Sequence, residues 1–391
     1  MSDAADASDD ERGSTERPHL RAFLGYFLGL GTWGFGGPIA TVGYMQRDLV
    51  EGRGWLDRGE FLDGVALGQT MPGPLAAQVS MWVGYLVSGA GGALAVAAAF
   101  IAPSFVFVLG VAVAYAHYQG LAVVQSLFYG IAPAVMAIIA IAAYKLARLT
   151  DRSDRRLWFL TVVIGVVTAI TGAEIALLFI GAGLLMIVLD VPPAWLRRGH
   201  GVLWPAGPML GALGGLAAGA GTQIALALFF LKAGAFIFGS GLAIVPFLRE
   251  GVVHQHHWLS ERQFLDAVAM GLITPGPVVI TATFIGYLVG GLVGALVATM
   301  AIFTPIYLGV VVPGRWFIRH RDNLQVKAFV KGATAAAAGA IAGATVVLTR
   351  QAVVDVPTGV IAAAALAVLL RFKVREPFVV AAGAVAGLLL H

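Results

Sequence analysis

The residues best suited to chemistry are two Pro-Gly-Pro triplets, at 72–74 and 275–277, each inside a long apolar stretch. Proline within a helix removes a hydrogen bond and clashes with the preceding turn, so neither triplet continues a helix. Pro74 and Pro277 suit the first position of a new helix, because their fixed φ is already helical. Each new helix would present free N–H groups and the positive end of its dipole, which favour an anion. The alternative is that each triplet only kinks a helix for packing.

Glycine-rich breaks and polar side chains surround both triplets and extend the predicted anion site. The amide and hydroxyl groups could donate hydrogen bonds to an oxyanion, or could only bond neighbouring helices. The predicted anion-binding residues are Gly36, Gly37, Pro38, Gln69, Thr70, Pro72, Gly73, Pro74, Lys232, Gly239, Ser240, Gly241, Thr274, Pro275, Gly276 and Pro277. Three further polar residues flank the prolines in the same way, namely Gln78, Thr281 and Thr283.

Lys232 is the only charged residue between Gly201 and Arg249. A lysine inside a membrane is costly and is by default a functional residue, and here its positive charge would attract the anion. The alternative is that its long side chain reaches an interface. The matching position in the first copy of the repeat described below is Gly29, so the predicted site is asymmetric.

Two carboxylates at matched positions, Asp63 and Asp266, lie just inside the segments that contain the triplets. Burial favours the neutral form of a carboxyl group, so both are candidates for carrying a coupling proton. Equally, each could cap a helix or pair with a nearby arginine, Arg58 or Arg262.

Three histidines, His254, His256 and His257, could bind a metal ion. They have no counterpart in the first copy, and we interpret them as solvated loop residues. The sequence therefore predicts no metal site and no cofactor.

The sequence contains an internal repeat. The offset is 203 residues from Phe35 and Phe238 onward, and it falls to 202 after the second triplet, where one residue is deleted. A repeat near 170 residues long indicates a duplicated domain and not a solenoid unit.

Composition indicates the class of protein. The chain of 391 residues is 59% hydrophobic and 12% charged, whereas soluble proteins are about 25% charged. Apolar runs of about 20 residues recur, which predicts an all-α polytopic membrane protein with about six helices in each repeat. The chain has no cysteine, which excludes disulfides and thiolate metal sites. Motifs typical of hydrolases and basic patches with interleaved aromatics are missing from the sequence, so we expect neither an enzyme nor a nucleic-acid-binding protein.

The repeat sets the expected domain boundaries. We expect a disordered N-terminal tail at 1–20, a first membrane repeat at 21–190 and a second at 223–391. The linker at 191–222 contains a candidate extra transmembrane segment.

Charged loops orient the two repeats, because Lys and Arg accumulate on the cytoplasmic side. Loop 117–121 has no Lys or Arg, whereas its partner 314–327 has four; loop 145–156 has five, whereas its partner has only Arg350. The bias is reversed, which predicts two inverted repeats with broken helices at the Gly/Pro motifs near the membrane centre.

Two arrangements of the triplet-containing segments remain open, since 59–88 and 262–289 could each cross the bilayer or enter and return. In both arrangements the segment 22–45 is expected to cross the bilayer. A crossing 59–88 leaves four positive residues outside and a re-entrant one leaves six, so we favour the crossing arrangement.

With these motifs the chain resembles the chromate ion transporter (CHR) family in its long, two-domain form. The resemblance covers 20–390, and it departs from the family at Ser240, where glycine is usual, and at Leu272, which stands where the first copy has Gln69. The motifs that carry it are F-G-G-P at 35–38, Gly84-Tyr85, F-L-K-A-G at 230–234, F-G-S-G at 238–241, and each Pro-Gly-Pro with the Trp, Phe and Asp before it.

The resemblance implies a bacterial inner-membrane transporter that exports chromate from the cytoplasm and gives chromate resistance. Some members of the family are thought to carry sulfate, and both ions are tetrahedral dianions that suit the anion site expected from the residues. We expect alternating access, with the anion bound at the converging helix N-termini. The alternatives are a transporter of sulfate or another oxyanion, or an anion channel. The expected partners are the oxyanion and the lipid bilayer, with a homodimer as one arrangement and no nucleic acid.

Overall fold

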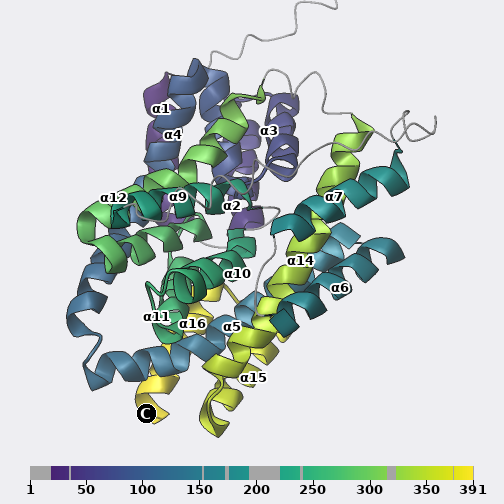
Figure 1. The fold of residues 1–391 in the computed structure, drawn as a ribbon. Coiled ribbons are helices and arrows are strands. Elements are labelled where there is room, and N and C mark those ends of the chain that lie inside the picture. The colour runs from purple at the N-terminus through teal and green to yellow at the C-terminus, as the bar shows by residue number, and fades with distance from the viewer. Residues whose placement is uncertain are drawn as a thin grey trace, which may run out of the picture.

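The computed structural model describes residues 19–34, 37–151, 154–171, 176–192, 221–237, 241–314, 323–372 and 374–390, and within these residues every regular element is a helix (Figure 1). The α-helices are α1 (Leu20–Trp33), α2 (Gly37–Met45), α3 (Arg58–Thr70), α4 (Leu75–Tyr118), α5 (Ala122–Asp151), α6 (Arg155–Thr171), α7 (Ala176–Asp190), α9 (Thr222–Ala235), α10 (Ile244–Arg249), α11 (Glu261–Ile273), α12 (Thr281–Val311), α14 (Leu324–Ala352), α15 (Val356–Arg371) and α16 (Glu376–Leu390). Short π and 3₁₀ turns are η1 (Gln46–Gly52), η3 (Gly241–Ala243), η4 (Glu250–Gln255) and η5 (Val278–Ile280).

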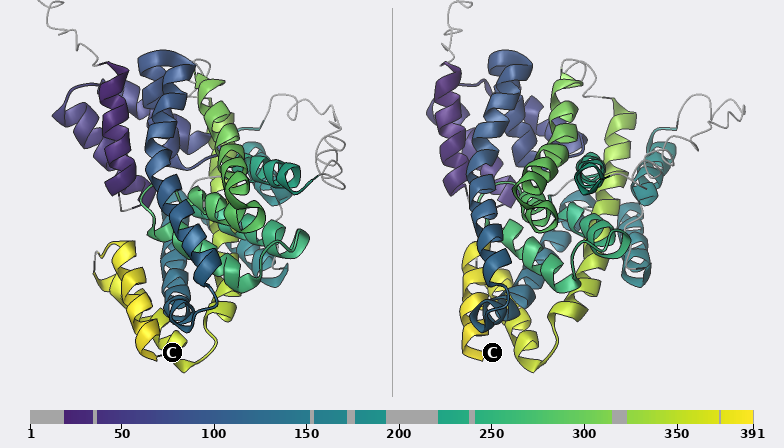
Figure 2. Two further views of the ribbon diagram at one scale, coloured as in Figure 1. Left: turned by 90° about the vertical axis from the view of Figure 1, so that its left-hand side faces the viewer. Right: turned by 60° about the vertical axis from the view of Figure 1, so that its left-hand side comes forward.

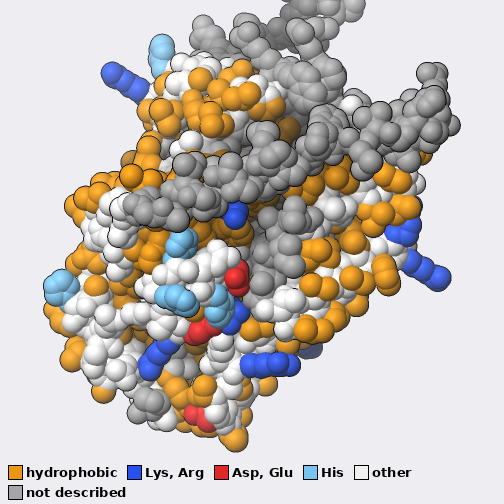
Figure 3. Space-filling view, viewed as in Figure 1, with side chains coloured by type: hydrophobic (Ala, Val, Ile, Leu, Met, Phe, Trp, Pro, Cys, Tyr) orange, Lys and Arg blue, Asp and Glu red, His pale blue; other side chains and the backbone are white. Residues whose placement is uncertain are grey.

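Among the described residues, four helical stretches are long and apolar enough to cross a membrane, namely α4, α5, α14 and the stretch Val278–Val311 that joins η5 to α12. Shorter apolar helices, among them α9, α15 and α16, pack around them. Apolar side chains also cover much of the visible surface in Figure 3, where a soluble protein would be polar. The prediction of an all-α membrane protein is therefore confirmed.

The two long helices α4 and α12 bend at matched positions. Gly89 has φ 60° and ψ −151° in α4, and Gly291 has φ 62° and ψ −151° in α12. This backbone conformation is accessible mainly to glycine. A Cβ atom on Gly84 would lie 2.3 Å from the carbonyl oxygen of Gly92, so the helix can fold back sharply only where glycine removes the side chain.

A π-helical turn also occurs at matched positions, as η1 in the first copy and η4 in the second. The N–H of Trp55 donates to Leu49 O at 2.8 Å, and the N–H of Trp258 donates to Val252 O at 2.8 Å. The 203-residue offset in the sequence thus corresponds to the same local backbone.

The segment 59–88 folds as a helical hairpin, and the single crossing favoured by the charge count is wrong. The indole N–H of Trp82 in α4 donates to Glu60 O at the start of α3, at 2.9 Å. A Cβ atom on Gly64 would lie 2.2 Å from Trp82 Cδ1. The two ends of the segment therefore lie side by side, and the chain turns back at the Pro-Gly-Pro triplet. Counting charges in loops cannot detect this turn, because the triplet carries no charge.

The segment 22–45, expected to cross, also turns back. The ring of Phe23 in α1 lies 4.9 Å from that of Trp55, which follows η1. The hydroxyl of Tyr26 donates to Asp48 Oδ2 at 3.3 Å. The start of α1 and the end of η1 therefore lie together, as they also do in the second copy, where Phe229 of α9 lies 5.7 Å from Trp258.

The terminal hairpins are exchanged between the two copies. Helices α6 and α7 of the first copy pack on α14 of the second, while α15 and α16 pack on α5 of the first (Figures 1 and 2). Glycine permits both contacts: a Cβ atom on Gly332 of α14 would lie 2.2 Å from Ala182 O, and one on Gly130 of α5 would lie 2.0 Å from Gly383 O. Such close approach of backbones is how helices associate where no hydrophobic effect acts between them. The sequence repeat gave no sign of this exchange.

Most of the predicted tail 1–20 and most of the predicted linker 191–222 lie outside the described residues. The domain boundaries and the disorder of the tail therefore stay predictions.

Candidate functional site

Each Pro-Gly-Pro triplet forms the tip of a helical hairpin. Helix α3 ends at Thr70 and α4 begins at Leu75, with Pro74 as its N-cap. Gly73 has φ 145° and Gly276 has φ 107°, which side chains rarely adopt, so the central glycine makes each turn accessible.

The second helix start differs in detail from the first. Pro277 caps the 3₁₀ turn η5, whereas Pro74 caps an α-helix directly. A 3₁₀ turn has 3.0 residues and an α-turn has 3.6. The one-residue deletion that reduces the repeat offset from 203 to 202 lies in this region, between Pro277 and Gly286.

The two tips meet beside Gly241, where a new helical turn begins after the end of α9. A Cβ atom on Gly241 would lie 3.7 Å from Pro74 Cβ and 3.5 Å from Val278 Cβ. The N–H of Gly73 donates to Ile237 O at 2.6 Å, just before this turn. The structure therefore brings the starts of α4 and η5 to one point, although they are about 200 residues apart in the sequence.

Each tip rests on the long helix of the other copy. A Cβ atom on Gly73 would lie 3.0 Å from Ile306 Cγ2 in α12, and one on Gly276 would lie 2.4 Å from Ser104 Oγ in α4. Ser104 and Ile306 occupy matched positions, one residue after Pro103 and Pro305. The packing is thus symmetric but its chemistry is not, because the Ser104 hydroxyl donates to Pro275 O and isoleucine has no donor.

Gln78 fixes the first tip from inside α4. Its side chain is fully buried, and its Nε2 donates to Met71 O at 3.2 Å and to Pro72 O at 2.9 Å. Its Oε1 atom is buried with no hydrogen-bond partner. The sequence grouped Gln78 with donors for an anion, but the structure uses its amide hydrogens on the carbonyls of the loop.

The predicted hydroxyl ligands donate to their own helices. Thr70 Oγ1 donates to Ala66 O at 2.6 Å, and Thr274 Oγ1 donates to Met270 O at 2.6 Å. A hydroxyl has one hydrogen, so each threonine would have to rotate before donating to an anion. Gln69 is exposed and makes no hydrogen bond among those found for the described residues.

Lys232 lies in the last turn of α9, and its Nζ is 5.7 Å from the centre of the Phe247 ring. It is exposed, so its ammonium group is accessible. Gly234, two residues on, would place a Cβ atom 2.8 Å from Pro305 Cγ. Because Pro305 precedes the Ile306 that supports the first tip, the last turn of α9, which carries Lys232, packs on the part of α12 beside that tip.

The two predicted proton carriers have different surroundings. Asp266 is 3% exposed, and Tyr115 Oη donates to its Oδ2 at 2.7 Å. Asp63 is only half-buried. The residue of the second copy that matches Tyr115 in the sequence is Phe317, which has no hydroxyl to donate.

The structure gives no side-chain environment for five of the predicted anion-binding residues. Gly36, Gly239 and Ser240 are outside the described residues, and Gly37 and Pro38 begin α2 with their side-chain environment undescribed. The role of all five residues in the anion site therefore stays a prediction.

The three histidines do not share a role. His254 Nε2 lies 3.4 Å from Glu261 Oε1, whereas the ring of His256 stacks on Trp258 with 4.2 Å between centres. Burial against this ring lowers the pKa of His256. His257 has φ 51°, at the position that matches Gly54 with φ 60°.

Sequence reasoning missed three features of this region, which are the bond from Ser104 to the second tip, the Tyr115–Asp266 pair, and the positioning role of Gln78. Ser104 had a signal that could have been used, since it follows an intrahelical proline that the repeat pairs with Pro305. The Tyr115–Asp266 pair had none, because it joins the two copies across 151 residues.

Comparison with known proteins gives one consistent result. A family profile described as chromate transporter matches residues 21–196 and 224–388. A chromate transport protein of Cupriavidus metallidurans is 49% identical over 374 residues, which cover 95% of this chain and 93% of that protein. A probable chromate transport protein of Synechococcus elongatus is 46% identical over 376 residues, which cover 95% of each chain. An uncharacterized transporter of Bacillus subtilis is 31% identical over 173 residues, which cover 42% of this chain but 95% of that protein. No solved structure matches the chain.

Proposed function

The chain belongs to the chromate transporter family, and we propose that it exports chromate from the cytoplasm by alternating access, binding the anion where the two Pro-Gly-Pro tips meet. The observation that carries this proposal is the convergence of Pro74 and Val278 on Gly241. Two helix starts at one point place free N–H groups and two positive dipole ends around it, which suits a tetrahedral dianion.

Lys232 would supply the full positive charge of this site. Chromate carries two negative charges, so partial helix charges alone would leave it incompletely neutralised. We expect Lys232→Ala to weaken chromate binding sharply, by about tenfold or more, because a hydrogen bond to a charged group contributes about 1.5–3 kcal/mol. Unchanged affinity in this variant would remove Lys232 from the site.

The contacts between loops support an inverted arrangement of the two copies. Arg156 and Lys331 both approach Asp190, at 2.9 and 4.0 Å, which places the start of α6, the end of α7 and the first turns of α14 at one end of the molecule. Tyr129 Oη donates to Asp355 Oδ2 at 2.5 Å at the other end. We assign the basic end to the cytoplasm. Among the described Lys and Arg residues, the outer end then carries only Arg249, Arg262 and Arg350.

In this arrangement each copy has two hairpins that enter the membrane and return, followed by four crossing helices. The hairpin of α3 enters from the cytoplasmic side and that of α11 from the outer side, so their tips meet near the membrane centre. Irregular backbone at this depth is tolerated only against protein or a water-filled cavity. Rocking of the bundles around the fixed tips would then expose the anion to one side at a time.

The membrane potential favours the proposed direction. Each charge is worth about 2.3 kcal/mol per 100 mV, so expelling a dianion from an inside-negative cell gains roughly 4.6 kcal/mol per 100 mV. Export therefore requires no coupling ion. Asp266 is the better placed of the two carboxylates for a proton-coupled component, because it is buried and paired with Tyr115.

The test is uptake of labelled chromate and sulfate into everted inner-membrane vesicles that contain the protein, with vesicles that lack it as the control. We expect chromate uptake driven by an inside-positive potential and only weak inhibition by sulfate. Equal uptake of sulfate would assign the site to oxyanions in general. A flux far above about a thousand ions per second would indicate a channel, and the absence of potential-driven chromate uptake would contradict the proposed export.

A further inference from the structure

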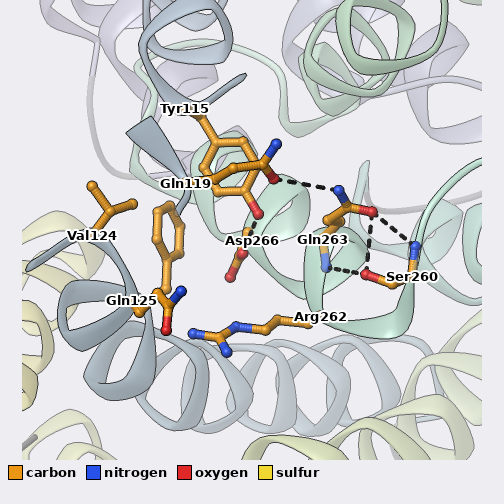
Figure 4. A pocket seen from close by; sticks show the side chains of 9 residues that line it. Tyr115, Gln119, Val124, Gln125, Ser260, Arg262, Gln263 and Asp266 are labelled. Carbon is orange, nitrogen blue, oxygen red and sulfur yellow. Dashed lines mark hydrogen bonds between the residues drawn. The ribbon is translucent and has the colours of Figure 1, made fainter. Parts of the chain in front are cut away.

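A polar pocket opens between the end of α4, the start of α5 and the start of α11 (Figure 4). Its volume is about 230 Å³. Its walls come from both copies, since α4 and α5 belong to the first and α11 to the second. The residues that line it are Tyr115, Gln119, Val124, Gln125, Phe128, Ser260, Arg262, Gln263 and Asp266.

The lining is rich in hydrogen-bond donors around one cation. Arg262 extends across the pocket toward Gln125 in Figure 4. Its charge acts on Asp266, four residues further along α11, but among the described residues no carboxylate lies within ion-pairing distance of it. By contrast, Arg249 forms an ion pair with Glu261, and Arg156 forms one with Asp154. The Ser260 hydroxyl donates to Gln263 Oε1 and the Gln263 amide donates to Gln119 Oε1, so these groups are already used within the lining. The donors left for a ligand are the exposed Arg262 guanidinium and the remaining glutamine amide hydrogens.

Asp266 forms the floor of the pocket, and α11 connects this floor to the central tips. From Asp266 the helix continues to Thr274, next to the second Pro-Gly-Pro triplet, which is about 12 Å at 1.5 Å per residue. The Asp266 Oδ2 atom is occupied by Tyr115, so the carboxyl group is directed into the protein and Arg262 faces the opening. The pocket thus lies at one end of α11, and the second tip follows the other end of the same helix.

We propose that this pocket is a second oxyanion-binding subsite, at the outer mouth of the transport path, in which Arg262 holds a tetrahedral dianion before release or after entry. This inference rests on the proposed function for the class of ligand. The first copy has no equivalent, because Gly59 stands where the second copy has Arg262, and Asp57 and Glu60 stand where it has Ser260 and Gln263. The subsite is therefore expected at one face of the membrane only.

The test uses the fact that the chain has no native cysteine. In the variant Gln125→Cys the introduced thiol lines the pocket, and its rate of modification by an anionic thiosulfonate reagent is measured on the full-length protein in lipid nanodiscs. Sulfate is the probe, because chromate oxidises thiols. At about ten times its dissociation constant, sulfate should slow modification roughly tenfold by mass action. Tyr118→Cys, at the exposed end of α4 and outside the pocket lining, is the control and should show no slowing.

Variants of the charged residues separate the subsite from the central site. Arg262→Ala should weaken protection by sulfate at least about tenfold, Arg262→Lys should retain part of it, and Asp266→Asn should strengthen it by removing a negative charge. Protection that is absent, or that is equal with and without Arg262, would overturn the proposal. If Gln125→Cys fails to fold, Gln119→Cys replaces it. This measurement does not depend on transport. If the protein takes up chromate but sulfate does not slow thiol modification, only the proposed subsite is contradicted. If sulfate slows modification but the protein takes up no chromate, only the proposed function is contradicted.

Discussion

The two Pro-Gly-Pro hairpins share a backbone and differ in their polar side chains. The first tip is fixed by Gln78 from its own helix and rests on Ile306. The second has Thr281 bonding to Val278 O in its own helix, and it rests on Ser104 of the other copy. A duplicated fold thus keeps the glycine and proline positions that set the turn, while the groups around the turn have diverged.

The mouths of the two hairpins differ more than the tips. The α3 end carries Asp57, Arg58, Glu60 and Asp63, whereas the α11 end carries Ser260, Glu261, Arg262 and the buried Asp266. In the inverted arrangement that we propose, these ends face opposite sides of the membrane. The comparison therefore predicts that equivalent substitutions in the two copies have unequal effects on transport, even where their effects on folding are similar.

The largest effects are expected at the central glycines of the tips. Gly276→Ala places a Cβ atom 2.4 Å from Ser104 Oγ at φ 107°, and Gly73→Ala places one 2.8 Å from the Gln78 side chain at φ 145°. Left-handed backbone costs roughly 1–2 kcal/mol with a side chain, and the clash adds to this. We expect both variants to lose nearly all chromate uptake and to unfold at a lower temperature in detergent micelles.

Gly241→Ala is the matched control for these two variants. Its Cβ atom would lie 3.5 Å from the nearest atom, which is ordinary contact, so its thermal stability should stay close to that of the parent. Its methyl group would project between the two helix starts, so chromate uptake should still fall. Normal uptake by Gly241→Ala would contradict the placement of the anion at this point.

The next effect concerns the two carboxylates. Asp266→Asn keeps the shape of the side chain but cannot carry a proton, so any part of chromate uptake that depends on a pH gradient should disappear. Asp63→Asn should change this component much less, because Asp63 is half-buried. Uptake is measured in vesicles at zero potential with an imposed pH gradient. Equal losses in the two variants would show that the asymmetry of their surroundings does not matter for coupling.

The sequence predicted the parts of this molecule that depend on local backbone. Pro74 and Pro277 break a helix whatever their neighbours, so the interrupted segments could be located. The direction of the chain after each break depends on packing, for example of Gly64 on Trp82, and the sequence pattern does not encode it. For this reason the hairpins were mistaken for crossings.

The side-chain partners of the tips were unpredictable for a related reason. Ser104 and Asp266 meet their partners across the boundary between the copies, so no spacing within one copy reveals them. Lys232 was identified from its isolation in an apolar run, whereas Arg262 was considered only as a partner of Asp266. Its position in a pocket became visible only with α4 and α5 beside it.

A smaller effect is expected from the hydrogen bond between the copies. Ser104→Ala removes the donor to Pro275 O, which should lower stability by about 0.5–1.5 kcal/mol and the unfolding temperature by a few degrees. The converse variant, Ile306→Ser, leaves a smaller side chain under Gly73 and loses packing without a bond of this kind to replace. Thermal unfolding of both variants in the same detergent is the measurement. An unchanged unfolding temperature for Ser104→Ala would show that the bond contributes nothing to tip packing.

The smallest effect is expected at a backbone position where the copies differ by one side chain. His257 has φ 51° where the first copy has Gly54 at φ 60°, so the histidine holds a conformation that suits glycine better. His257→Gly removes a strain of roughly 1–2 kcal/mol but raises the entropy of the unfolded chain by about 0.4–1 kcal/mol, which leaves a net gain of about 0.5–1 kcal/mol. Gly54→His should lose a similar amount, and chromate uptake should be unaffected in both, because neither residue lies near the tips. The pair is compared by thermal unfolding at one pH. A less stable His257→Gly variant would mean that the imidazole makes a contact that stabilises the fold by more than the backbone strain costs.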